Sequence, residues 1–254
     1  MGKYFTVEVK PTIPNVAAGQ HAVFAQDDLL FDWYAFDIPK GTSKLVSASV
    51  EVRPKGDSGS TVNEFDLDLL IAKTHKGSAP PSIGTVNSAA FASSVNLSNH
   101  MVAVITNGNF GAFELHSDST AFSNGLKTNI TSAALPFFTG EPDSGANVGY
   151  DRFYMAAIAE GAFDFRSILT INAGDLTGPV LTVADLDARL HLAVGDTLKA
   201  TTTADTAVSK DMGVIKSIDS ATQITLESAF TTAVVDNDFV YNAAPITFRL
   251  HFEK

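Results

Sequence analysis

Hydrophobic and polar residues alternate with a period of two over many short segments of this chain. The first segment, Tyr4 to Val9, and the last, Ile246 to Phe252, show the alternation most cleanly. Such a pattern is typical of β-strands that have one face in a core and one face in water. The clean alternation at both ends predicts that the first and last strands meet in one sheet.

Further strand candidates between the two ends are separated by turn residues, chiefly Pro and Gly. They cover Leu29–Ile38, Lys44–Arg53, Glu64–Lys73, Met101–Thr106, Ala112–His116, Tyr154–Glu160 and Phe163–Thr170. Helical periodicity is scarce, and only the region of Phe91 and the segment 181–192 are candidates for a short helix. Strands at this spacing predict an all-β fold, an antiparallel β-sandwich of jelly-roll type.

The segment from about 180 to 242 is rich in Thr, Asp and Val and has a pattern of its own. Its strand candidates are Thr197–Thr203, Gly213–Ile218, Gln223–Leu226 and part of Val234–Tyr241. Several short strands in one short segment favour a small β-barrel. Because the last strand is predicted to return to the first sheet, this barrel would be an insertion before that strand. We therefore predict a sandwich from 1–178 plus 243–254 and a barrel-like domain at 179–242.

The composition excludes several classes of protein. The 254 residues include no Cys, which excludes disulfides, thiolate zinc sites and cysteine nucleophiles. Lys+Arg number 17 against 28 Asp+Glu, a net charge of −11, which argues against a nucleic-acid partner. No apolar run approaches about 18 residues, and the first residues do not resemble a secretion signal, so we expect no membrane partner.

Charge is unevenly distributed along the chain. Between Gly77 and Leu126 there is no Lys or Arg, and only Glu114 and Asp118 are acidic. The segment is either a buried core with polar turns or a subunit interface, because interface cores are depleted in charge. Exposed terminal strands can also recruit partners by strand addition. From this segment and the terminal segments Lys3–Lys10 and Ile246–Lys254, the interface candidates are Phe91, Val95, Met101, Val102, Phe110, Phe113, Phe5, Val7, Phe248 and Phe252.

Motifs that could carry catalysis are weak. The string Gly56-Asp57-Ser58-Gly59 resembles the one around the nucleophile of chymotrypsin-like serine proteases, but only His21 precedes it as a candidate base. A Gly/Ser-rich hairpin loop explains the string better. The six histidines show no metal-ligand spacing, and no nucleotide-binding glycine motif is present. We therefore expect no enzyme activity, no metal and no cofactor.

Two groups of residues suggest an alternative role. Glu64, Asp66 and Asp68 would share one face of a strand, where carboxylates bind calcium, act as an acid/base pair or simply face water. Trp33 and Tyr34 lie beside other carboxylates, a composition that suits stacking on sugar rings, although a Trp in an apolar strand is usually core. A carbohydrate-binding site would use Trp33, Tyr34, Asp66 and Asp68.

The inserted segment resembles a module of structural proteins of tailed bacteriophages. The resemblance covers about a fifth of the chain and rests on Val194-Gly195-Asp196, Gly213-Val214-Ile215, Thr222-Gln223-Ile224-Thr225-Leu226 and Asp236-Asn237-Asp238-Phe239-Val240-Tyr241. It implies a role in the virus particle and carries over no active-site residues.

The expected function is therefore that of a non-enzymatic virion structural protein, most specifically a capsid decoration or cement protein. Such a protein would be made in the host cytoplasm, form homo-oligomers and bind the major capsid protein or other virion proteins. The alternative is a carbohydrate-binding β-sandwich of a head fibre or tail accessory protein. A glycosidase using Asp66 or a hydrolase using Ser58 is the third and weakest interpretation.

Overall fold

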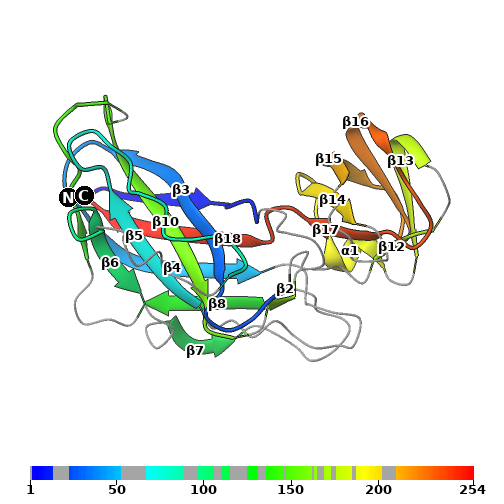
Figure 1. Cartoon of the computed structure of the whole chain (residues 1–254), viewed down its shortest axis with the longest axis horizontal. Helices are drawn as coiled ribbons and strands as arrows, with labels where there is room; N and C mark the ends of the chain where they lie inside the picture. The colour runs from blue at the N-terminus through cyan, green and yellow to red at the C-terminus, as the bar shows by residue number, and fades with distance from the viewer. Residues whose placement is uncertain are drawn as a thin grey trace.

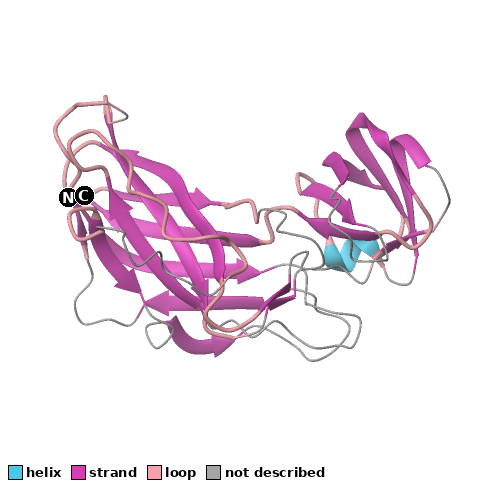
Figure 2. Cartoon of the chain, in the orientation of Figure 1, coloured by secondary structure: helices cyan, strands magenta, loops and turns pink. Residues whose placement is uncertain are grey.

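The computed structural model describes residues 2–13, 23–52, 67–88, 97–105, 110–114, 125–130, 136–145, 147–161, 163–164, 169–172, 176–184, 187–201 and 210–254. Strands dominate these residues, and their single helix is the short α1 (Ala188–His191). Figure 2 shows this helix in cyan beside the magenta strands. The predicted all-β fold class is confirmed.

Two antiparallel sheets form the larger part of the molecule. The β4 sheet has the order β1-β18-β4-β8-β7, with β9 also pairing with β4, and the β10 sheet has the order β3-β10-β5-β6. A separate two-stranded ribbon joins β2 (Val23–Phe24) to β11 (Phe163–Asp164). The strands of the two sheets are β1 (Tyr4–Val9), β3 (Leu29–Pro39), β4 (Ser43–Val52), β5 (Leu67–Lys73), β6 (Met101–Ile105), β7 (Phe110–Glu114), β8 (Gly125–Ile130), β9 (Phe137–Phe138), β10 (Tyr150–Ala159) and β18 (Ile246–Glu253).

The strand order is that of a jelly roll. If β1, β3, β4, β5, β6, β8, β10 and β18 are lettered B to I in chain order, the two sheets read B-I-D-G and C-H-E-F. This is the double Greek-key arrangement that defines the jelly roll. Strand β7 is an addition beside β8 at the edge of the β4 sheet. The predicted jelly-roll-like sandwich is thus confirmed at the level of topology.

Aromatic side chains fill the space between the two sheets. Phe138 lies with its ring centroid 5.0 Å from that of Phe153 in the β10 sheet and 5.0 Å from that of Phe252 in the β4 sheet. All three side chains are fully buried. Each such burial stabilises the fold by about 1.5–3 kcal/mol, so this cluster holds the sheets together.

The first strand pairs along its whole length with the last strand. The register runs from Tyr4 opposite Glu253 to Val9 opposite Phe248. Figure 1 shows the N and C labels side by side at one end of the sandwich. The prediction that both ends of the chain meet in one sheet is confirmed.

A closed barrel is inserted between β10 and β18, at the right in Figure 1. Its strands close in the order β12-β13-β16-β15-β14-β17, and its apolar core contains no residue of the sandwich core. The barrel strands start at Thr170, before the boundary at residue 179 that the composition indicated. They are β12 (Thr170–Ile171), β13 (Leu176–Ala184), β14 (Thr197–Thr201), β15 (Lys210–Ile218), β16 (Gln223–Val234) and β17 (Phe239–Asn242).

The helix predicted at 181–192 is mostly wrong. Leu181 and Val183 alternate into the barrel core as part of β13, and only Ala188–His191 is helical. A short apolar run fits either a strand or a helix, and here the closed barrel decides for the strand. Of the strand expected at 163–170, the described residues form β11 and the start of β12, and 165–168 lie outside the described part of the chain. Strands β8 and β9 were not expected, and the region of Phe91 also lies outside the described residues.

Candidate interaction surfaces

Polar residues on the outward face of β1, β18 and β4 pair with one another across the strands. Arg249 on β18 lies 3.2 Å from Glu8 on β1 and 3.0 Å from Glu51 on β4. Thr6 is hydrogen-bonded to the ring of His251 at 2.8 Å. These cross-strand pairs satisfy each other's polar groups, which is the behaviour of a face turned to water.

The outward face of the β10 sheet is covered by the chain that connects β5 to β6. Leu70, Ile158 and Ile83 belong to an apolar cluster separate from the main core, with Ile83 supplied by that connection. Trp33 on β3 packs against the same cluster and donates its indole N–H to the carbonyl of Pro81 at 2.8 Å. Trp33 therefore anchors the covering segment.

The predicted carbohydrate contacts are not brought together as a set. Trp33 has its one hydrogen-bond donor engaged by Pro81, whereas Tyr34 is 39% exposed. Asp68 is half-buried on β5, and Asp66 lies outside the described residues. The aromatic residues in the sequence of β3 did not reveal whether the Trp33 ring is free or packed against a loop.

The predicted interface residues of the charge-poor segment lie at sheet edges. Met101 and Val102 are half-buried on β6, which ends the β10 sheet among the described residues. On the same strand Val104, which the sequence did not single out, is 51% exposed. Phe110 and Phe113 belong to β7, the edge of the β4 sheet. The remaining two candidates, Phe91 and Val95, lie outside the described residues.

The interface candidates in the terminal strands need correction. Phe248 and Phe252 are fully buried in the sandwich core and cannot meet a partner without unfolding. Phe5 and Val7 are half-buried, and Phe5 stacks on Phe252 at a centroid distance of 5.2 Å. The alternation placed these four residues on one face, and the β10 sheet covers that face.

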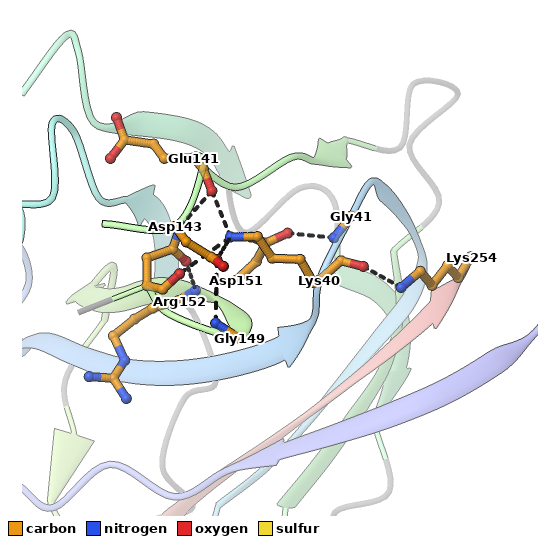
Figure 3. Close-up of polar contacts among 9 residues, drawn as sticks. Lys40, Gly41, Glu141, Asp143, Gly149, Asp151, Arg152 and Lys254 are labelled. Carbon is orange, nitrogen blue, oxygen red and sulfur yellow. Dashed lines mark hydrogen bonds and ion pairs between the residues drawn. The ribbon is translucent and has the colours of Figure 1, made fainter. Parts of the chain in front are cut away.

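Loops at the end of the sandwich that carries both termini form a polar cluster around Lys40 (Figure 3). The Lys40 ammonium lies 2.7 Å from the carboxylate of Asp143 and 3.1 Å from that of Asp151. It also donates to the carbonyls of Glu141 at 2.8 Å and Asn147 at 3.3 Å. Four oxygens therefore surround one ammonium, and Lys40 holds the loop after β9 against the β3–β4 turn. Contact with Asp143 raises the pKa of Lys40 and lowers the pKa of Asp143.

Glu141 ties a second loop into this cluster. Its carboxylate accepts the backbone N–H groups of Lys76 at 2.7 Å and Gly77 at 3.1 Å. Burial raises the pKa of Glu141, but the N–H groups of Gly77 and Lys76, the Thr74 side chain and His75 together outweigh it, so the pKa lies below the ordinary 4.5. The buried Asn147 donates to the Glu141 carbonyl at 2.6 Å and accepts from the Arg152 backbone N–H at 2.9 Å. The loop 74–78 is thereby fixed to the start of β10.

Asp151 is the most enclosed member of the cluster. Its residue is 2% exposed and its carboxylate accepts the backbone N–H of Gly41 at 2.8 Å. A side chain at Gly140 would place its Cβ 2.2 Å from this carboxylate. Lys254 donates its ammonium to the carbonyl of Lys40, which joins the last residue to the cluster. No pattern along the chain indicated this cluster, because its members come from distant segments.

Among the described residues, no group of three or more His, Cys, Asp or Glu side chains is arranged to hold a metal ion. The four-residue α1 is far shorter than a bilayer-spanning helix, and the described part of the chain offers no helix of that kind.

No family model and no curated protein matches the chain. Among solved structures the chain is similar to a protein in the structure of infectious bursal disease virus, Gx strain, at 10% identity and a TM-score of 0.17. The likeness covers 99% of this chain and 40% of the viral chain, so this chain spans less than half the length of that protein. A likeness this weak carries no functional argument.

Proposed function

We propose that this chain is a non-enzymatic structural protein of a virus particle, and more specifically a decoration or cement protein on the head of a tailed bacteriophage. It would function by binding to the capsid shell and to sister subunits over a large contact area. The predicted partners are the major capsid protein or other virion proteins.

The fold is compatible with this role but does not decide it. Jelly rolls recur in viral capsid proteins and in lectins, and one fold hosts many functions. The argument therefore depends on surfaces. The resemblance of the inserted barrel segment to phage structural proteins supports a role in the virus particle.

The observation that carries the proposal is the uncharged strand β6, which ends the β10 sheet among the residues that the structure describes. Its five residues, Met101–Ile105, include no charged side chain, and Val104 is 51% exposed. Natural edge strands usually carry charges or Pro that discourage pairing with another chain. The opposite type of edge occurs at β1, where Glu8 lies on the strand and Lys10 follows it. An uncharged edge favours addition of a partner strand.

The net charge of −11 supports the same role. Like charge keeps free subunits soluble before assembly. It also disfavours contact with packaged DNA, which attracts basic surfaces. Both properties suit the outside of a capsid.

The test is association with empty, expanded heads of a tailed phage. The purified chain is mixed with the heads, and co-sedimentation and the solution mass of the chain alone are measured. Val104→Lys should abolish binding or self-association, because a charge on the edge opposes strand addition. Val148→Lys is the matched control, since Val148 is 59% exposed but lies outside every strand.

A chain that remains monomeric and never sediments with heads contradicts the proposal. If Val104→Lys and Val148→Lys lose binding to the heads equally, the added charge, and not the β6 edge, controls association. Circular dichroism of both variants establishes that the fold is retained.

A further inference from the structure

One row of residues crosses four strands of the β4 sheet at the end that carries both termini. Tyr4 on β1 lies opposite Glu253 on β18, Glu253 lies opposite Lys44 on β4, and Lys44 lies opposite Phe137 on β9. Directly paired residues project to the same face of a sheet. The next residues along these strands point inward to the core: Phe5, Phe252, Leu45 and Phe138. The row therefore faces outward.

Both ends of this row are exposed aromatic rings. Tyr4 is 72% exposed and Phe137 is 64% exposed, the largest values for aromatic side chains among the described residues. Neighbouring strands lie about 4.8 Å apart, so three strand spacings separate the two rings by about 14 Å.

The residues between the rings are polar. Glu253 accepts a hydrogen bond from the Tyr4 hydroxyl at 3.2 Å, which raises the pKa of Tyr4. Lys44 supplies hydrogen-bond donors at the centre of the row. The next rows of the same face are the polar pairs of Thr6 with His251 and of Arg249 with two glutamates.

This composition fits a sugar chain better than a protein surface. A protein interface needs a contiguous apolar centre, whereas here charged residues separate the two rings. A pyranose ring presents an apolar C–H face that stacks on an aromatic ring and a rim of hydroxyls that bind carboxylates and ammonium groups. The net charge of −11 disfavours acidic sugars.

We propose that Tyr4, Lys44, Phe137 and Glu253 form a platform that binds a neutral oligosaccharide laid across the strands. The two rings stack on sugars about 14 Å apart, and Lys44 and Glu253 bind the hydroxyls of the sugar between them. This platform lies on the opposite sheet from Trp33 and Tyr34. It does not depend on the capsid role proposed above.

The experiment screens the purified chain against immobilised neutral oligosaccharides and then measures affinity by calorimetry for linear oligomers of increasing length. Affinity should rise until the oligomer reaches both rings. Tyr4→Ala and Phe137→Ala should each weaken binding at least about tenfold, the equivalent of about 1.4 kcal/mol. Tyr4→Phe keeps the ring and should retain most of the affinity.

Tyr34→Ala is the matched control, because Tyr34 is an exposed aromatic residue on the other sheet. Binding that is unchanged in the Tyr4→Ala, Phe137→Ala double variant, or no binding of any neutral oligosaccharide, overturns the proposal. A drop in solution mass in the same variants, with no sugar bound by the parent chain, would identify the row as a protein contact and also overturns it. Circular dichroism verifies that each variant is folded.

Discussion

The ammonium of Lys40 lies 3.1 Å from the carboxylate of Asp151, whose side chain is 2% exposed. Lys40 begins the turn after β3, and Asp151 lies near the start of β10, so one ion pair joins segments far apart in sequence. A buried carboxylate needs a partner, because desolvation strongly disfavours an isolated charge. This pair therefore determines how the loops at the terminal end of the sandwich are packed.

Lys40→Met should destabilise the chain more than Lys44→Met does, because it leaves Asp151 buried without its cation. Chemical denaturation gives the two free energies of unfolding. In the Lys40→Met, Asp151→Asn double variant the loss should be smaller than the sum of the single losses, because the two groups interact directly. Additive losses would contradict the pairing.

Gly140→Ala should lower the free energy of unfolding by about 1–3 kcal/mol, the usual cost of forcing extra atoms into a packed site. The new Cβ would lie 2.2 Å from the carboxylate of Asp151, so this carboxylate must shift from the position in which it pairs with Lys40. Gly149→Ala is the control. Its φ of +82° is strained for Ala, but no atom lies within 4 Å of the added Cβ. A Gly140→Ala protein as stable as the parent would show that the cluster is loose.

In the barrel, Lys210→Met should cost about 3–5 kcal/mol, because removal of one partner leaves a buried charge. The Lys210 ammonium lies 2.6 Å from Asp238, and their side chains are 10% and 0% exposed. Lys199→Met is the matched control, since Asp211 in that pair is 84% exposed. A surface pair of this kind contributes about 0–1 kcal/mol. Thermal denaturation measures the stability of both variants. An equal decrease in melting temperature for Lys210→Met and Lys199→Met would contradict the predicted difference in stability.

The barrel should fold when it is expressed alone as residues 169–243. Its apolar core consists only of barrel residues. Because the sheet is closed, each of its six strands has a neighbouring strand on both sides. Far-ultraviolet circular dichroism and a cooperative thermal transition would verify this. A fragment that shows no cooperative transition would mean that the sandwich is needed to stabilise the barrel.

Acid should destabilise the sandwich through Glu141 and Asp143. Folding lowers the pKa of both groups from ordinary values of 4.5 and 3.8, so their contribution is present above those values. It is lost as pH falls through the lowered folded values. The free energy of unfolding should therefore stay level from neutral pH to about pH 5 and then decrease.

Glu141→Gln should lower stability at pH 7 and flatten the decrease in acid. Glu227→Gln is the comparison, because Glu227 is exposed on β16. Denaturant unfolding across the pH range measures both effects. A Glu141→Gln curve parallel to that of the parent chain would exclude Glu141 as a source of the acid sensitivity.

Alternation in the sequence was enough to predict the pairing of the ends of the chain. Tyr4–Val9 and Ile246–Phe252 each place apolar residues at every second position, so each strand has one apolar face that needs a core. The change in composition near residue 180 likewise indicated the inserted barrel. These features are local, so the sequence carries them without knowledge of the fold.

Only the tertiary structure decided which apolar residues remain exposed. Phe248 and Phe137 both lie in apolar strand segments, yet one is fully buried and the other is 64% exposed. Period two determines which residues share a face, but distant chain segments determine whether that face is covered. For the same reason, neither the Lys40 cluster nor the contact of Trp33 with Pro81 could be predicted from the sequence. Their partners come from loops that have no periodic pattern.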